Sequence, residues 1–333
     1  MSESKFQAGQ ATLGRLPGWA TSLSPGRIAA ELWRRMAPFA ALIAILIVIF
    51  ELNPAASSYT GLSLLLAYAI PLMLAATAQM FIIAAGDIDL GIGSFIGLIN
   101  ALSVTLLARH PGFGALALAG CVLAYAFMGV FVHLRGLPGI VVTLSAGFVW
   151  LGIAIFLLPT PGGAAPSWLA GILGAQVPFV PLPIVIAVVL ALVVHLLVFR
   201  TSYGAILRGA GGNPRAVARM GWSLLGTRAA LYGLAGLFGV LAGLAVTGVT
   251  TSGDANVGAS YTLLSIASVI LGGGEFGGGR ISAVGAVVGA ITLSLVGTLL
   301  AFLNVSSDYQ IGVQGVILLA VLAARAFDRR RRG

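Results

Sequence analysis

The sequence predicts an all-α polytopic membrane protein with about ten transmembrane helices, some of them short or broken. Of its 333 residues, 59% are apolar and only 8% are charged, and the mean hydropathy is +1.06. Soluble domains carry roughly a quarter charged residues, and disordered chains are rich in charge and poor in apolar residues. Both classes are therefore excluded. Long apolar runs separated by short polar loops are typical of helical membrane proteins instead.

The apolar runs divide the chain into three parts. Residues 1–36 are polar and are expected to form a cytoplasmic or interfacial segment, in which Ser24 and Pro25 could start a short helix. Residues 37–327 form the transmembrane domain, and residues 328–333 form a basic tail. The predicted runs are 39–52, 62–85, 92–108, 113–134, 140–158, 179–199, 224–250, 261–271, 283–303 and 311–327. Several are shorter than the ~20 residues of a full span and are candidates for broken or tilted helices.

The arginines give the orientation. All but one of the 18 cationic side chains are Arg, and the exception is Lys5. If the N-terminus is cytoplasmic and ten spans alternate, 17 cations lie on the cytoplasmic side and only Arg109 lies outside. Cytoplasmic loops of membrane proteins are enriched in Lys and Arg. We therefore predict that both termini are cytoplasmic, and that the net charge of +9 faces the cytoplasm and anionic lipid rather than a nucleic acid.

Several kinds of catalytic chemistry are missing from the sequence. Because Lys5 is the only lysine, the chain has no Gly-x-x-x-x-Gly-Lys-Ser/Thr loop to bind ATP phosphates. The three histidines are far apart and have no metal-ligand spacing, and Cys121 is the only cysteine, so no metal site is predicted. An enzyme is therefore disfavoured, and no cofactor is expected on this chain.

Two glycine-rich acidic loops are candidates for a gate or hinge. The first contains Gly86, Asp87, Asp89 and Gly91, and the second contains Glu275. The alternative for the two aspartates is simple capping of the helix that follows, where side-chain oxygens meet free N–H groups. Small residues also recur four apart at 93/97, 239/243 and 285/289, which favours close helix packing within one subunit.

The spans offer neutral polar side chains rather than buried acids. Hydroxyl, amide and aromatic groups suit a neutral, hydrogen-bonding solute, although a helix–helix hydrogen bond is the alternative for each of them. The candidate pathway residues are Tyr68, Gln79, Asn100, Thr143, Ser145, Trp150, Ser265 and Ser268.

The longest basic cytoplasmic stretch, residues 200–223, predicts a short surface helix that docks into a partner. Gly211 and Gly212 end the preceding structure, Asn213 can cap, and Pro214 suits the first turn of a helix through about Met220. Arg215 and Arg219 are four residues apart and share one face of that helix. The alternative is a solvated basic loop.

Four segments of the chain match the motifs of a known family. Residues 86–94 read GDIDLGIGS, residues 137–144 read LPGIVVTL, residues 211–216 read GGNPRA, and residues 266–273 read IASVILGG. In this order they resemble the permease subunits of ATP-binding-cassette importers for monosaccharides, such as ribose, whose corresponding segments are GIDLSVGS, LPPFIVTL, GGNPxA and IAAVVLGG. Branched-chain amino-acid permeases are more distant relatives.

The resemblance implies a bacterial inner-membrane subunit that pairs with a second permease copy, identical or different. It implies two cytoplasmic ATPase subunits or one tandem ATPase, which would bind ATP and magnesium, and a periplasmic or lipid-anchored solute-binding protein. It also implies that the ATPase contacts the coupling segment. The residues assigned to that contact are Gly211, Gly212, Asn213, Pro214, Arg215, Ala216 and Arg219.

The sequence departs from the family pattern at Thr262 and Leu264, where acids are frequent, and at Glu275, where small or hydroxyl residues are usual. These differences affect the expected solute rather than the architecture. The sequence therefore favours an ATP-driven sugar importer that works by alternating access. The alternative is a secondary transporter of a small neutral solute that is coupled to ions.

Overall fold

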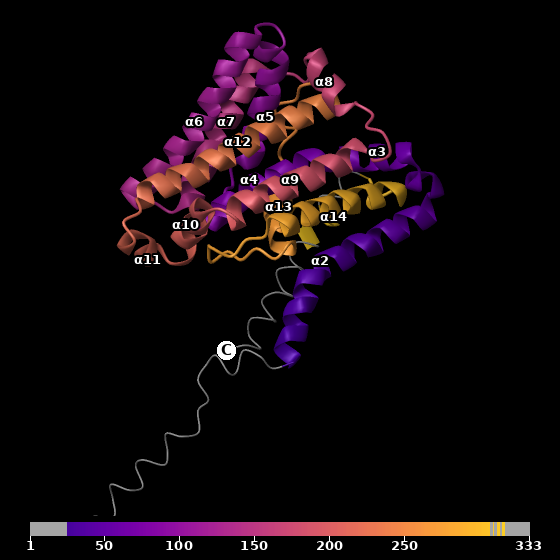
Figure 1. Cartoon of the computed structure of the whole chain (residues 1–333). Coiled ribbons are helices and arrows are strands. Elements are labelled where there is room, and N and C mark those ends of the chain that lie inside the picture. The colour runs from indigo at the N-terminus through magenta and orange to yellow at the C-terminus, as the bar shows by residue number, and fades with distance from the viewer. Residues whose placement is uncertain (1–24, 307–308, 310–311, 314, 317–333) are drawn as a thin grey trace, which may run out of the picture.

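The described part of the chain is a bundle of helices. The computed structural model describes residues 25–306, 309, 312, 313, 315 and 316. Within these residues the helices are joined by loops, and a single isolated β-bridge pairs Gly162 with Gly253. Figure 1 shows the long helix α12 (Leu224–Thr250) running diagonally through the bundle. Helices α4, α5 and α6 pack on α12, and α2 and α9 pack on α14.

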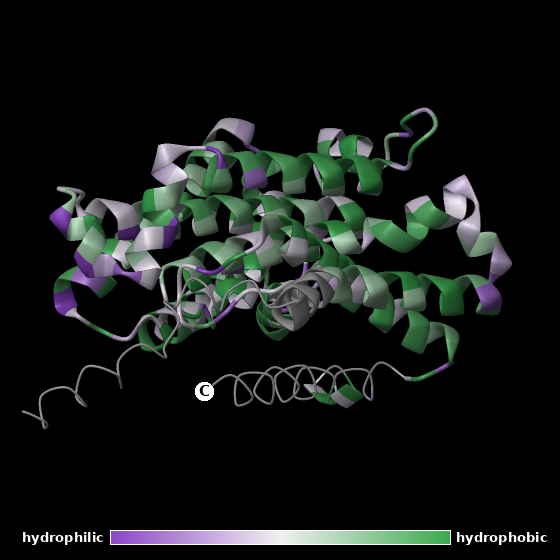
Figure 2. Ribbon diagram, turned by 60° about the horizontal axis from the view of Figure 1, so that its bottom comes forward, coloured by the Kyte–Doolittle hydropathy of each residue, from purple (hydrophilic) through white to green (hydrophobic). Residues whose placement is uncertain are grey.

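Five described helices are long and apolar enough to cross a membrane. They are α6 (Pro111–Arg135), α7 (Gly139–Leu157), α9 (Leu182–Phe199), α12 and α14 (Ala283–Phe302). A sixth span is possible if α3 (Tyr59–Ala67) and α4 (Ala69–Ala84), which meet at a 43° bend, count as one. The hydrophilic residues in Figure 2 gather mainly near the helix ends and loops, whereas the helix bodies are hydrophobic. The chain is thus a multi-pass membrane protein.

Shorter helices complete the bundle. Helix α2 is described over Pro25–Leu52, and its apolar part starts at Met36. The predicted short helix is thus part of one continuous helix with the first apolar run, and Ser24, the predicted cap, lies outside the described residues. Helix α5 (Ile92–Leu102) continues into a π-helical turn (Ser103–Leu107), and α13 (Tyr261–Leu271) has only 11 residues. The remaining short helices are η2 (Pro54–Ser57), α8 (Ser167–Leu173), α10 (Ser202–Gly212) and α11 (Pro214–Arg219).

Most predicted apolar runs coincide with helices. The boundaries of the runs 140–158, 179–199, 224–250, 261–271 and 283–303 agree with α7, α9, α12, α13 and α14 to within a few residues. Helix α8 interrupts the charge-free loop 159–176, where no helix was predicted. Most of the last run, 311–327, and the whole of the segments 1–24 and 328–333 lie outside the described residues.

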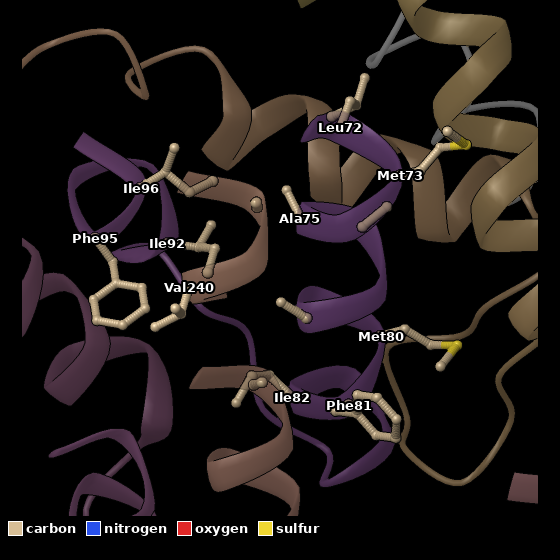
Figure 3. Packing of buried hydrophobic residues seen from close by; sticks show 14 of the residues in the cluster. Leu72, Met73, Ala75, Met80, Phe81, Ile82, Ile92, Phe95, Ile96 and Val240 are labelled. Carbon is tan, nitrogen blue, oxygen red and sulfur yellow. The ribbon is translucent and has the colours of Figure 1, made fainter. Parts of the chain in front are cut away.

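Helix α4 is the centre of the core. Every residue of this helix except Leu74 is buried, and it packs against α12, α13 and α14. Figure 3 shows Phe81 and Ile82 of α4 and Ile92 and Phe95 of α5 around the segment of α12 that carries Val240. A helix that is apolar on all sides belongs in the interior of a bundle, and its burial fixes the positions of the loops at its ends.

The three predicted small-residue pairs all serve close contacts within the subunit. A β-carbon at Gly239 would lie 2.9 Å from the Phe95 ring, and one at Gly243 would overlap Ile99. Gly285 and Gly289 meet the backbone of α13, and Gly93 and Gly97 meet the loop between α12 and α13. Without a hydrophobic drive in lipid, this close approach is what holds the helices together.

We predict that Gly243→Val lowers the thermal unfolding midpoint of the detergent-solubilised protein. The added side chain overlaps Ile99, and overpacking costs about 1–3 kcal/mol. Gly120→Val on α6 is the control, because a β-carbon there meets nothing within 4 Å. Equal midpoints for the two variants would contradict this packing.

Candidate functional site

The basic stretch 200–223 folds into two capped helices, as the sequence predicts. The Thr201 hydroxyl accepts a hydrogen bond from the Gly204 N–H (2.9 Å) at the start of α10. The Asn213 side chain accepts one from the Ala216 N–H (3.1 Å), and Pro214 occupies the first turn of α11. Capping satisfies N–H groups that have no partner within the helix. It therefore fixes the sharp corner between the two helices.

Helix α11 presents a basic and apolar outer face. Its Val217 is 1% exposed and packs near Gly209, which anchors the helix on α10. Arg215 and Arg219 are exposed. Met220 is 63% exposed and Trp222 45% exposed. We call these four exposed residues the α11 surface.

The α11 surface is joined to the membrane helices through backbone contacts. A β-carbon at Gly211, near the end of α10, would overlap the carbonyl oxygen of Ala84 at the end of α4. The Gly279 N–H donates to that same oxygen (3.2 Å), so the loop 272–282 meets α10 and α4 at one point. Contacts between backbones leave little room for independent motion. These contacts join the end of α10, which leads into α11, to the end of α4 and to the loop that follows α13.

The first acidic loop, which follows α4, is clamped to α12. The Asp87 carboxylate pairs with the Arg228 guanidinium (2.7 Å) and accepts a hydrogen bond from the Tyr232 hydroxyl (2.9 Å). Both partners lie on the same face of α12, one turn apart. Charge-assisted hydrogen bonds are about twice as strong as neutral ones. This clamp holds the loop against the helix that α11 leads into.

Asp89 fixes the other end of the loop. Its carboxylate accepts hydrogen bonds from the Tyr125 hydroxyl (2.9 Å) on α6 and from the Gly91 N–H (2.7 Å) just before α5. The Gln79 amide, oriented to satisfy both groups, bonds the backbone N–H and C=O of Asp89 at 3.1 and 3.2 Å. The Thr143 hydroxyl accepts from the Leu90 N–H (3.1 Å). The loop is thereby tied to α4, α6 and α7.

The predicted hinge and the predicted coupling segment lie together. A cleft of about 310 Å³ opens between them. Its walls include Gly86 of the first acidic loop, Gly211 and Pro214 of the coupling segment, Arg228, and Phe276 of the second glycine-rich loop. Sequence reasoning treated these segments separately, whereas the structure makes them neighbours. Whether Gly86, Asp87, Asp89, Gly91 and Glu275 act as a gate stays a prediction.

Glu275 makes a different kind of contact from the two aspartates. Its carboxylate lies 3.4 Å from the guanidinium of Arg280, which is 76% exposed. Exposed ion pairs contribute about 0–1 kcal/mol, so this pair adds little to the loop. Among the described residues, no group of three or more His, Cys, Asp or Glu side chains could hold a metal ion.

Most candidate pathway residues are buried between helices. Five of them are fully buried, with 0% exposure: Gln79, Asn100, Thr143, Ser265 and Ser268. Ser265 and Ser268 donate to carbonyls of their own helix, as exposed Ser145 does. Tyr68 is 61% exposed. Their part in a pathway stays a prediction.

Trp150 lies in an aromatic group with Phe95 and Tyr125. The ring centroids of Phe95 and Tyr125 are 4.4 Å apart, and those of Tyr125 and Trp150 are 6.4 Å apart. The indole Nε1 of Trp150 is buried and has no hydrogen-bond partner among the residues that the structure describes. The aromatic group therefore packs α5, α6 and α7 together next to Asp89.

Sequence reasoning missed the partners of the aspartates. Arg228 and Tyr232 were counted only as a cytoplasmic cation and as part of an apolar run. A signal was present, because an Arg and a Tyr four residues apart on a membrane helix are costly unless they pair within the protein. Their position opposite Asp87 follows only from the packing of α4 against α12.

Comparison with known proteins identifies the family. The sequence model described as "Branched-chain amino acid transport system / permease component" matches residues 61–322. The chain belongs to this family of transport permeases. No solved structure matches the chain. The resemblance to ATP-binding-cassette sugar permeases is thereby confirmed, and the chain is a transport subunit rather than an enzyme.

Curated relatives resemble this permease over most of their length. The ribose import permease protein RbsC of Bacillus subtilis is 28% identical over 306 residues, which cover 88% of this chain and 93% of that protein. RbsC of Escherichia coli is 28% identical over 85% of this chain and 91% of its own. The autoinducer 2 import system permease protein LsrD of an Enterobacter strain is 26% identical over 75% of this chain and 80% of its own.

We predict that Asp87→Asn destabilises the permease, because Arg228 loses its counter-charge. The loss should be on the order of 2 kcal/mol, less than for a fully buried pair because Arg228 is 27% exposed. Glu275→Gln is the control, since it breaks an exposed pair. Thermal unfolding in detergent would measure both, and an equally small effect of the two changes would argue against the clamp.

Proposed function

We propose that this permease is the membrane-spanning subunit of an ATP-binding-cassette importer for a monosaccharide or a similar small polar solute. It moves the solute by alternating access, and a separate ATPase supplies the energy. Relatives named for the import of ribose and of autoinducer 2 support this solute class. The neutral polar side chains of the spans are consistent with it.

The α11 surface carries the proposal. Two exposed arginines, with an exposed methionine and tryptophan beside them, form a face suited to docking on another protein. The capped corner at Asn213 holds that face rigid, and Gly211 connects it to the end of α4. An ATPase that docks here can displace the acidic loop and α12 together.

In this proposal the chain crosses the bacterial inner membrane ten times, with both termini in the cytoplasm. The segregation of 17 cations to one side supports this orientation. It places the α11 surface in the cytoplasm and the loop containing α8 outside. The short helices α5 and α13 then account for broken spans.

The proposed complex contains two permease copies, identical or different, and two ATPase subunits or one tandem ATPase. A periplasmic or lipid-anchored protein delivers the solute. In this proposal ATP and magnesium bind the ATPase. The sequence of this chain supports that assignment, because it contains no Lys-bearing phosphate-binding loop. The lipid bilayer is the remaining partner.

We predict that Arg215→Glu and Asn213→Ala weaken the binding of the ATPase. The first change reverses a charge on the docking face, and the second removes the cap that orients it, at a cost of about 1 kcal/mol to the helix. Co-purification of the ATPase with the permease and solute-stimulated ATP hydrolysis by the complex would both fall several-fold.

Arg109→Glu is the matched control. It makes the same change of charge at an exposed arginine on the opposite, external side in the proposed orientation. It should leave both measurements unchanged. Wild-type binding and hydrolysis in the Arg215 and Asn213 variants would refute the docking role of α11.

A further inference from the structure

The ten residues between α12 and α13 leave helical geometry inside the bundle. Helix α12 has 27 residues and is therefore about 40 Å long, at ~1.5 Å per residue. After its end at Thr250 the chain forms turns over residues 251–260 before α13 begins at Tyr261. Thr251 has φ +56°. This left-handed conformation is uncommon for a β-branched residue and marks a constrained start to the segment.

Contacts with α5 show how deep the segment reaches. The Asp254 N–H donates to the Asn100 side chain (2.6 Å), a β-carbon at Gly97 would overlap the Ala255 carbonyl, and one at Gly93 would overlap the Gly258 carbonyl. The segment therefore follows α5 from its end towards its beginning. At the beginning of α5, the side chains of Ile92 and Phe95 pack directly against Gly239 of α12.

Gly239 lies near the middle of α12. It is about 22 Å from the start of that helix and about 16 Å from its end, at ~1.5 Å per residue. Gly258 is therefore close to the midplane of the membrane that α12 crosses. Helix α13, with 11 residues, is long enough to cross the remaining half of the membrane. Residues 251–260 thus run from one side of the membrane to its centre without forming a helix.

Most of the exposed side chains of this segment are polar. Asn256 and Ser260 are exposed, and Asp254 is half-buried. The Asp254 carboxylate accepts a hydrogen bond from the Asn256 N–H (2.8 Å), and within the described residues it has no cationic partner. Much of the segment's backbone is paired within the protein: Gly253 exchanges hydrogen bonds with Gly162, and the Val257 and Ala259 N–H groups donate to carbonyls of the segment itself. The charged Asp254 carboxylate and the exposed polar side chains are the groups that cannot face lipid, because hydrocarbon does not solvate them.

A second permease copy is a poor cover for the same surface. A second copy that covered this surface would have to supply a partner for the Asp254 carboxylate from its own face. A carboxylate buried without a counter-charge is costly. Water is the occupant that solvates the carboxylate and the exposed Asn256 and Ser260 side chains together.

We propose that residues 251–260 form a wall of the aqueous solute passage. In this wall Asp254 makes the passage more favourable for neutral, hydroxyl-bearing solutes than for anionic ones. Asn100 is then a positioning residue: its amide donates to the Ser252 carbonyl and to Thr247 on α12, and its oxygen accepts from Asp254. This inference rests on the proposed transport function and adds a location and a charge preference to it.

Thiol accessibility tests the wall. Cys121, the lone cysteine, is replaced by Ala, and single cysteines are placed at Asn256 and Ser260 in the complete transporter. Right-side-out and inside-out membrane vesicles are then treated with membrane-impermeant methanethiosulfonates, one cationic and one anionic. We expect both cysteines to react from at least one side.

Leu123→Cys is the matched control. Leu123 is 69% exposed on α6, and its neighbour Val122 lies beside Gly236 of α12, so it has a similar depth on an apolar face. It should not react from either side. If the cysteines at 256 and 260 are as unreactive as the one at 123, the wall is refuted.

The charge preference has its own readout. After normalisation to a free thiol in solution, the cationic reagent should modify Asn256→Cys faster than the anionic one. The additional change Asp254→Asn should reduce that ratio by roughly threefold to fivefold at low salt. An unchanged ratio would overturn the role of Asp254. Co-purification of the ATPase, measured on the same vesicles, tests the proposed function separately. If the cysteines at 256 and 260 do not react but the ATPase still co-purifies, only the wall is refuted.

Discussion

The structure depends on one constraint, that backbone which is not helical inside a bilayer must find its hydrogen bonds in protein or water. Two segments meet this constraint. The loop between α4 and α5 does so through Gln79, Thr143 and Asp89, whose side chains bond its backbone. The segment between α12 and α13 does so through Asn100 and, in our proposal, through water. The buried polar side chains of the spans therefore shape loops, and helix packing is only part of their role.

Glycine makes these arrangements possible. Gly93 and Gly97 leave a groove on α5 that accepts the backbone of residues 255–258, and Gly211 lets α10 touch the end of α4. The clamp from Asp87 to Arg228 and Tyr232 then connects that touching point to α12. A series of backbone contacts and one ion pair thus connects the segment that carries the α11 surface to the membrane-spanning helix α12. If an ATPase docks at α11 as we propose, this series of contacts is the route by which its movement would reach the proposed passage.

The helices and the coupling segment could be predicted from the sequence, because apolar run length and capping are local properties. Asn213 and Pro214 specify the start of α11 wherever the chain lies. The partners of Asp87 and the depth of residues 251–260 could not be predicted. Both depend on which faces of α4, α5 and α12 meet, and a helix such as α4, apolar on all sides, carries no sequence pattern that specifies its neighbours. Asp254 was overlooked because a polar stretch after a long apolar run is typical of an exposed loop.

The central claim is that this subunit provides a passage through the membrane, while the energy comes from a protein bound at α11. Uptake of radiolabelled monosaccharides into proteoliposomes tests it most directly. The permease is reconstituted with and without its ATPase and solute-binding protein, in the presence of ATP or of an imposed proton or sodium gradient. The account predicts accumulation only with the complete complex and ATP. Accumulation by the permease alone, driven by an ion gradient and abolished by an ionophore, would contradict it.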